Sequence, residues 1–122
     1  MRTILVVDDD KTFTGLLKTI FEMEGYATLI AHRPEDVLPM ARETKPTVVL
    51  MDVHTGRGDT FAVLQELRAE EALQDVIVVM DSGMDHTTEC LSRGADAFIL
   101  KPFRPSELLD VITGLVDNEE QA

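Results

Sequence analysis

The chain has 122 residues, of which 44% are hydrophobic and 28% charged, and its formal net charge is −12. This length corresponds to one domain that is large enough to bury a core. The excess of acidic residues disfavours direct binding to nucleic acid or to an anionic membrane surface, because both carry negative charge.

The longest apolar runs have four or five residues, far fewer than the roughly 20 that a membrane-spanning helix needs. The single cysteine, Cys90, cannot form an internal disulfide, which is typical of a reducing compartment. We therefore expect one soluble domain in the cytoplasm, without contact to a membrane.

Short apolar runs bounded by polar or turn residues predict five β-strands. Three of the runs are nearly continuous in Val, Ile, Leu and Met, as in strands that are buried on both faces of a parallel sheet. The predicted strands are Ile4–Val7, Ala27–Ala31, Thr47–Met51, Val76–Met80 and Ala97–Leu100.

The intervening segments have the apolar spacing of helices. The first helix ends near Gly25, in the place of a C-terminal cap, and the second spans about 34–43 and contains Pro39, which should kink it or end it early. The fourth spans about 84–93 and has a thin apolar face of Met84 and Leu91. Apolar positions of the other helices are Phe13, Leu16, Leu17 and Ile20; Phe61, Val63, Leu64 and Leu67; and Leu108, Leu109, Ile112, Leu115 and Val116.

Alternating strands and helices predict an α/β fold with a parallel sheet and right-handed crossovers. The last helix should open at Pro105, and residues 117–122 should form an acidic tail or the start of a linker after a domain of residues 1–116. Ligands of such sheets bind at the carboxyl ends of the strands, so the residues that follow the strands are the functional candidates.

Polar residues follow four of the predicted strands: Asp8, Asp9 and Asp10 after the first, Asp52 after the third, Asp81 and Ser82 after the fourth, and Lys101 after the fifth. Of these, we expect Asp8, Asp9, Asp52 and Lys101 to converge at one edge of the sheet. Carboxylates that converge in this way repel one another and favour a hard cation such as Mg²⁺. A carboxylate can also act as a nucleophile and form an aspartyl phosphate. The alternative is that the three aspartates only cap the first helix.

Three motifs together resemble the receiver domain of bacterial two-component response regulators. They are ILVVDDD at 4–10, VVLMD at 48–52 and GADAFILKPF at 94–103, and the resemblance covers about residues 2–116. It implies a flavodoxin-like (βα)₅ fold with helices on both faces of a five-stranded parallel sheet in the order 2-1-3-4-5.

The resemblance also implies the roles of the site residues. Asp52 would accept a phosphoryl group from a phosphohistidine of a sensor histidine kinase or a histidine phosphotransfer protein, and Lys101 would pair with the phosphate. Asp9, Asp52 and the backbone carbonyl of His54 would bind Mg²⁺, with Asp8 acting through water. The peptide bond before Pro102 would be cis. The chain would be a signalling domain and not an enzyme, beyond Mg²⁺-dependent self-phosphorylation and self-dephosphorylation.

The sequence departs from the family at the predicted switch. Members of the family have a Ser or Thr at the end of the fourth strand, where the predicted strand places Met80. Ser82 could replace that hydroxyl only if the loop changes its register, whereas the aromatic partner is present as Phe98. The loop after Asp52 also differs, with Gly56 and Thr60 where Pro and Gly are frequent.

The sequence therefore leaves three functions open. The first is a phosphorylated receiver that switches the face of its fourth helix, fifth strand and fifth helix toward a downstream protein or an attached output domain. The second, prompted by Met80 and the altered loop, is an unphosphorylated pseudo-receiver that acts as a protein-interaction module. The third is a small haloacid-dehalogenase-like phosphatase with its nucleophile in the segment from Asp8 to Thr12, although the later acidic pair of that superfamily is missing.

Overall fold

The computed structural model describes residues 2–56 and 58–121. Five strands form one parallel sheet in the order β2-β1-β3-β6-β7. The two remaining strands, β4 (His54–Thr55) and β5 (Gly58–Asp59), form a separate antiparallel pair. The main sheet therefore has the predicted order 2-1-3-4-5. Its strands are β1 (Thr3–Val7), β2 (Ala27–Ala31), β3 (Val48–Asp52), β6 (Ile77–Ser82) and β7 (Ala97–Leu100).

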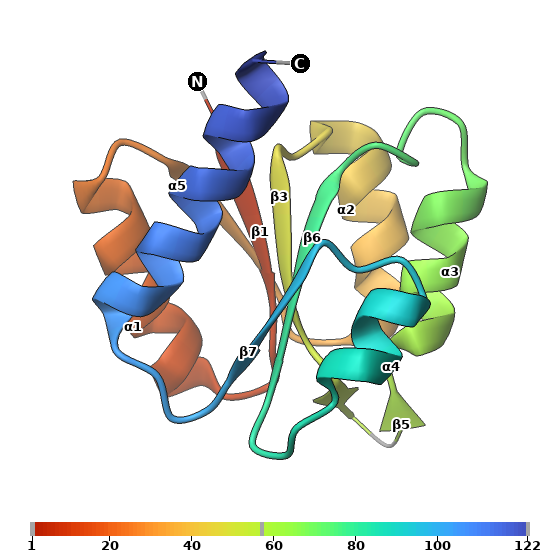
Figure 1. Ribbon diagram of the computed structural model, residues 1–122, viewed down its shortest axis with the longest axis horizontal. Helices are drawn as coiled ribbons and strands as arrows, with labels where there is room; N and C mark the ends of the chain where they lie inside the picture. Colours follow the sequence, from red (N-terminus) through yellow and green to blue (C-terminus); the bar gives the residue numbers. More distant parts are fainter. Residues whose placement is uncertain (1, 57, 122) are drawn as a thin grey trace.

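Helices cover both faces of the sheet (Figure 1). One face packs against α1 (Lys11–Met23) and α5 (Pro105–Gln121). The opposite face packs against α2 (Val37–Thr44), α3 (Phe61–Ala69) and α4 (Thr87–Ser92), and the short 3₁₀ helix η1 (Pro34–Asp36) precedes α2. Each face has its own cluster of buried apolar residues, which makes this a three-layer α/β fold.

The alternation of side chains along the strands decides which residues reach which face. Ile4 and Val6 of β1, Val48 and Leu50 of β3, and Ile77 and Val79 of β6 belong to the cluster under α1 and α5. The intervening residues, such as Met51 and Met80, belong to the opposite cluster. Two residues further along each strand, the same alternation brings Asp8, Asp52 and Asp81 to the α1 and α5 side of the sheet.

The fourth strand of the sheet ends later than the sequence predicted. The apolar run stops at Met80, but β6 continues through Asp81 and Ser82 because these residues pair in register with β3 and β7. Asp81 lies opposite Asp52, and Ser82 lies opposite Leu100. Neighbouring strands, and not the hydrophobicity of the segment, thus set the end of β6.

Two helix predictions were wrong in detail. Pro39 does not end the second helix early, because it occupies the third position of α2, where a missing N–H leaves no intrahelical bond broken. The fourth helix begins only at Thr87, whose backbone N–H and hydroxyl both donate to the Asp85 side chain. Its expected apolar residues, Met84 and Leu91, are exposed, and Cys90 is the buried residue of α4.

The last helix starts at Pro105, as predicted, and continues through Gln121. Residues 117–121 thus continue α5, and residue 122 lies outside the described residues, so the expected tail or linker at 117–122 stays a prediction. None of the described helices has the length and apolar character that crossing a membrane requires.

Candidate functional site

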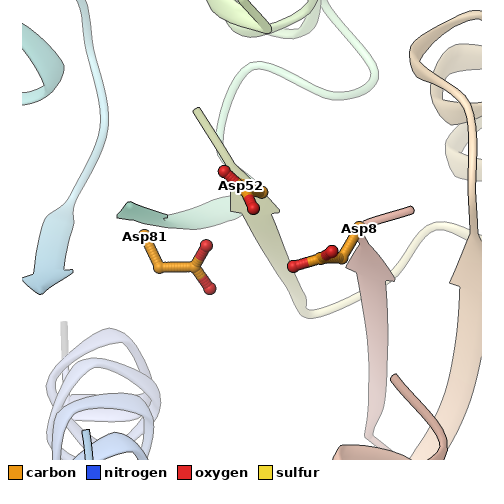
Figure 2. A group of neighbouring side chains, drawn as sticks. All are labelled: Asp8, Asp52 and Asp81. Atoms are coloured by element: carbon orange, nitrogen blue, oxygen red, sulfur yellow. The ribbon is translucent and has the colours of Figure 1, made fainter. Parts of the chain in front are cut away.

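Three carboxylates and one ammonium meet at the carboxyl edge of the sheet. Asp8 follows β1, Asp52 ends β3, and Asp81 lies near the end of β6. Figure 2 shows the three side chains side by side, with Asp52 between the other two. One oxygen of each carboxylate lies within 4.8 Å of the others, which would be strongly repulsive without a cation.

Lys101 supplies that cation from the end of β7. Its Nζ donates to Asp8 Oδ2 at 3.0 Å and to Asp52 Oδ2 at 2.9 Å, and it lies 3.6 Å from Asp81 Oδ1. The backbone N–H of Lys101 donates to the Ser82 carbonyl at 2.8 Å, which fixes the start of this segment against β6. One ammonium therefore faces three carboxyl groups, and when all three are ionised the group carries an excess of two negative charges.

Burial changes the proton affinity of these groups. It raises the pKa of Asp81 to about 7, an effect that Asp52 and Asp8 reinforce and Lys101 opposes. The pKa of Asp8 is also raised by burial, against the hydrogen bonds from the Asp10 N–H and Lys101. For Lys101, burial alone lowers the pKa, but attraction to Asp81, Asp52 and Asp8 outweighs it, so the pKa is raised.

Asp52 is the most accessible of the three carboxylates. Its side chain is 14% exposed, compared with 3% for Asp8 and 2% for Asp81. Its Oδ1 accepts from the backbone N–H of His54 at 2.9 Å. The Thr60 hydroxyl donates to the Asp52 carbonyl at 2.7 Å and so ties the following loop to the strand end.

Asp9 and Asp10 lie at the rim of the site. Asp9 is exposed. Its Oδ2 accepts from the backbone N–H of Gly56 at 3.4 Å, so the side chain faces the loop that follows Asp52. Asp10 caps α1 by accepting from the Phe13 N–H at 3.0 Å, as one of the sequence interpretations expected. Capping thus belongs to Asp10, which leaves the Asp9 carboxylate available to a ligand.

Met80 and Ser82 do not face this site. Met80 is fully buried in the cluster under α2, α3 and α4, on the other side of the sheet. Ser82, two residues further along β6, points to the same side as Met80, and its Oγ accepts from the Met84 N–H at 3.1 Å. Placing Met80 at the site was wrong, because a shift of one residue along a strand reverses the face. Phe98 packs partly buried against the Met80 side of the core.

Asp81 was missed as a site residue. It is the residue of β6 that lies opposite Asp52 and faces Lys101, and its Oδ1 is buried without a hydrogen-bond partner among the described residues. A signal for it was present in the sequence: Ile77, Val79 and Asp81 repeat the alternation of Val48, Leu50 and Asp52.

A hollow of about 460 Å³ opens beside Lys101. Two aromatic side chains form its apolar wall: the Phe13 and Phe103 rings lie 5.9 Å apart, and Lys101 Nζ lies 4.6 Å from the Phe13 ring centre. The Lys101–Pro102 peptide bond is cis, as the resemblance implied. The hollow is wide enough for a planar side chain or a small anion to approach the ammonium. It is lined by Asp10, Phe13, Gly83, Lys101, Pro102 and Phe103.

The donor set fits a hard divalent cation. Every side-chain ligand at this edge is a carboxylate oxygen, the type of ligand that Mg²⁺ prefers, and the carboxylates outnumber the single ammonium. Lys101 already contacts Asp8, Asp52 and Asp81, and the Asp9 carboxylate is not among the acidic groups of the described residues that lie within 4.8 Å of one another.

Comparison with known proteins identifies relatives over nearly the whole chain. The family model described as "Response regulator receiver domain" matches residues 4–113. The "DNA-binding response regulator MtrA" of Mycolicibacterium paratuberculosis is 32% identical over 106 residues, which cover 87% of this chain and 47% of that protein. The "Probable transcriptional regulator ycf27" of Cyanophora paradoxa is 32% identical over 119 residues, or 98% of this chain and 50% of that protein. The chain spans about half the length of the curated relatives that it matches.

Solved structures have the same fold. A receiver domain protein (CheY-like) from Methanospirillum hungatei JF-1 superimposes with a TM-score of 0.91 at 27% identity, covering 99% of this chain and 98% of that one. The receiver domain of the Francisella response regulator 1452 gives a TM-score of 0.89 at 27% identity, covering 98% and 99% of the two chains.

Proposed function

This chain belongs to the response regulator receiver domain family, and from that membership we propose that it accepts a phosphoryl group on Asp52 in two-component signal transduction. One observation carries the choice of acceptor: Asp52 is the most accessible carboxylate of the group and is paired with Lys101. The low exposure of Asp8 argues against a haloacid-dehalogenase-like nucleophile there.

The reaction transfers a phosphoryl group between two nucleophiles. An Asp52 carboxylate oxygen attacks the phosphorus, and the P–N bond of the phosphohistidine breaks, with its electron pair remaining on the imidazole nitrogen. The charge at Asp52 changes from −1 to about −2. Lys101 would exchange its bond to Asp52 Oδ2 for one to a phosphoryl oxygen, which stabilises the transferred charge.

A Mg²⁺ ion would be held by Asp9, Asp52 and the His54 backbone carbonyl, with Asp8 acting through water. The cation would supply charge neutralisation at the phosphoryl oxygens. Support comes from the excess of carboxylates over ammonium groups and from the position of Asp9 beside the loop that follows Asp52. The side-chain contact of Asp9 with Gly56 is long, so this carboxylate can turn toward Asp52 without losing a strong bond.

Millimolar Mg²⁺ should raise the melting temperature of the protein, because binding to the folded state alone adds about 2.7 kcal/mol at a hundredfold excess over Kd. Asp9→Asn should lose most of this shift. Asp10→Asn is the matched control: Asn caps a helix as well as Asp does, so that variant should keep the shift. Equal Mg²⁺ responses in both variants, measured by thermal denaturation, would remove Asp9 from the metal site.

The direct test of phosphoryl transfer uses intact mass spectrometry. The protein is incubated with acetyl phosphate and Mg²⁺, beside the Asp52→Asn variant. We expect the parent to gain one phosphoryl group and the variant to gain none, because an amide is a poor nucleophile. A parent that gains no phosphoryl group under conditions that label another receiver domain would refute this function.

Phosphorylation would act by shifting the population of two conformations of the face formed by α4, β7 and α5. Its partners would be a sensor histidine kinase or a histidine phosphotransfer protein upstream, and a downstream protein or an output domain on that face. The exposed side chains of Leu91 and Leu100 support an interaction there. We place the domain in the cytoplasm, without direct contact to nucleic acid.

The second candidate function is a pseudo-receiver that binds proteins without phosphorylation. It is favoured by one observation: a carboxylate, Asp81, and not a hydroxyl, faces the acceptor from β6. The mass measurement separates the two functions, since a pseudo-receiver would gain no phosphoryl group.

A further inference from the structure

Asp81 is the unusual member of the site. Its side chain is 2% exposed, its Oδ1 has no hydrogen-bond partner among the described residues, and its closest cation is Lys101 Nζ at 3.6 Å. Lys101 gives its short contacts to Asp8 and Asp52 instead. Asp81 therefore adds a buried negative charge that the existing pairs only partly neutralise.

The position of Asp81 determines what this charge acts on. Asp81 lies opposite Asp52 in the β3–β6 register, and both side chains project toward Lys101. The resemblance predicted a hydroxyl donor at this strand end, but Ser82 is turned to the other face and accepts from Met84. An ionised carboxylate can only accept hydrogen bonds, so it offers a phosphoryl oxygen no donor.

We propose that Asp81 restrains phosphorylation of Asp52 through its buried negative charge, which repels the incoming phosphoryl group beside Lys101. The inference rests on the proposed function of Asp52. A phosphoryl group on Asp52 must take a donor from Lys101, and it places further negative charge within a few ångströms of the Asp81 carboxylate. In a poorly hydrated site, charges at such distances interact strongly.

The charge balance gives the direction of the effect. When acetyl phosphate is the donor, an Asp52 oxygen bonds to phosphorus, and the bond from phosphorus to the acetyl oxygen breaks, so that acetate leaves with the electron pair. The site then gains one negative charge beside Asp81. Neutral side chains at position 81 remove this repulsion.

The test compares the initial rates of phosphoryl gain in the Asp81→Asn, Asp81→Thr and Asp81→Glu variants. Intact mass is measured near pH 8, where Asp81 is ionised, with acetyl phosphate and saturating Mg²⁺. We expect Asp81→Asn and Asp81→Thr to raise the rate of phosphoryl gain at least about tenfold over the parent, which corresponds to about 1.4 kcal/mol in the activation free energy. Asp81→Glu should not raise it, because this variant retains the charge. Asp110→Asn, the same charge change at an exposed position of α5, should leave the rate unchanged.

Each outcome decides something, provided that every variant unfolds cooperatively. Faster labelling of the Asn and Thr variants than of a labelled parent supports the inference; labelling of these variants with none of the parent also supports it but makes the parent a pseudo-receiver. A parent that is labelled as fast as Asp81→Asn, or a rate that also rises in Asp81→Glu or Asp110→Asn, overturns the inference but leaves phosphorylation of Asp52 standing. No labelling of the parent or any Asp81 variant overturns both proposals.

Discussion

Replacing Lys101 by alanine should destabilise the protein by about 2–4 kcal/mol near pH 8 in the absence of divalent cations, because removing one partner leaves buried charge unpaired. Lys101 is the ammonium that contacts Asp8, Asp52 and Asp81, two of which are almost completely buried. The Lys101 side chain is 25% exposed, so the expected loss of stability is smaller than for breaking a fully buried ion pair. The variant should also lose most of its phosphoryl gain.

The destabilisation of Lys101→Ala should depend on pH and on Mg²⁺. Near pH 5 the carboxyl groups of Asp8 and Asp81, whose pKa values are raised by burial, can take up protons and so relieve the repulsion, and millimolar Mg²⁺ should restore part of the stability near pH 8. Lys18→Ala, at an exposed position of α1, is the control. Urea denaturation measures the free energy of unfolding; equal losses in the two variants near pH 8 without cation would contradict the assigned contacts.

Asp81→Asn should be more stable than the parent near pH 8, by about 2–4 kcal/mol, and this difference should shrink toward pH 5 and vanish only near pH 3.8. The folded-state pKa of Asp81 is about 7, against an ordinary value of 3.8, because burial disfavours the charged form. Between these two values the folded parent binds a proton that the unfolded chain has lost. The stability of the parent therefore falls as the pH rises through this window, and it stays lowered above pH 7.

Asn removes this dependence because it does not ionise. The measurement is a series of urea unfolding curves between about pH 5 and pH 8 with a chelator present, for the parent, Asp81→Asn and the exposed control Asp110→Asn. Some pH dependence should remain in Asp81→Asn, since the pKa of Asp8 is also raised. A stability difference that stays constant across the series would show that Asp81 does not titrate in this range.

The order of strands and helices could be predicted because each element carries its own local pattern. The apolar runs of β1, β3 and β7 are followed at once by Asp8, Asp52 and Lys101, so the end of the hydrophobic run and the end of the strand nearly coincide. The parallel arrangement then brings these residues together without further information. This part of the site follows from sequence alone.

Asp81 follows the apolar run of β6 as directly as Asp8 and Asp52 follow theirs, but it was assigned no role because the resemblance implies a hydroxyl, and not a carboxylate, at this strand end. Two polar residues remain in the strand since β3 and β7 pair with them, a tertiary effect that hydrophobicity does not record. Placing the strand end at Met80 then assigned the wrong side chain to the site. The start of α4 is similar, because it is set by the bond from the Thr87 N–H to the Asp85 side chain. The residue that this helix buries is Cys90, and the spacing of Met84 and Leu91 predicts neither feature.

The identity of the phosphorylated residue tests the central claim most directly. After incubation with acetyl phosphate and Mg²⁺, borohydride reduction converts an aspartyl phosphate into homoserine, which peptide mass spectrometry can locate. Because the neutral Asp81→Asn variant should carry more of the modification, it is analysed together with the parent. We predict homoserine at position 52 and at no other aspartate. Homoserine at Asp8, Asp9 or Asp10, or none in either protein, would contradict the account.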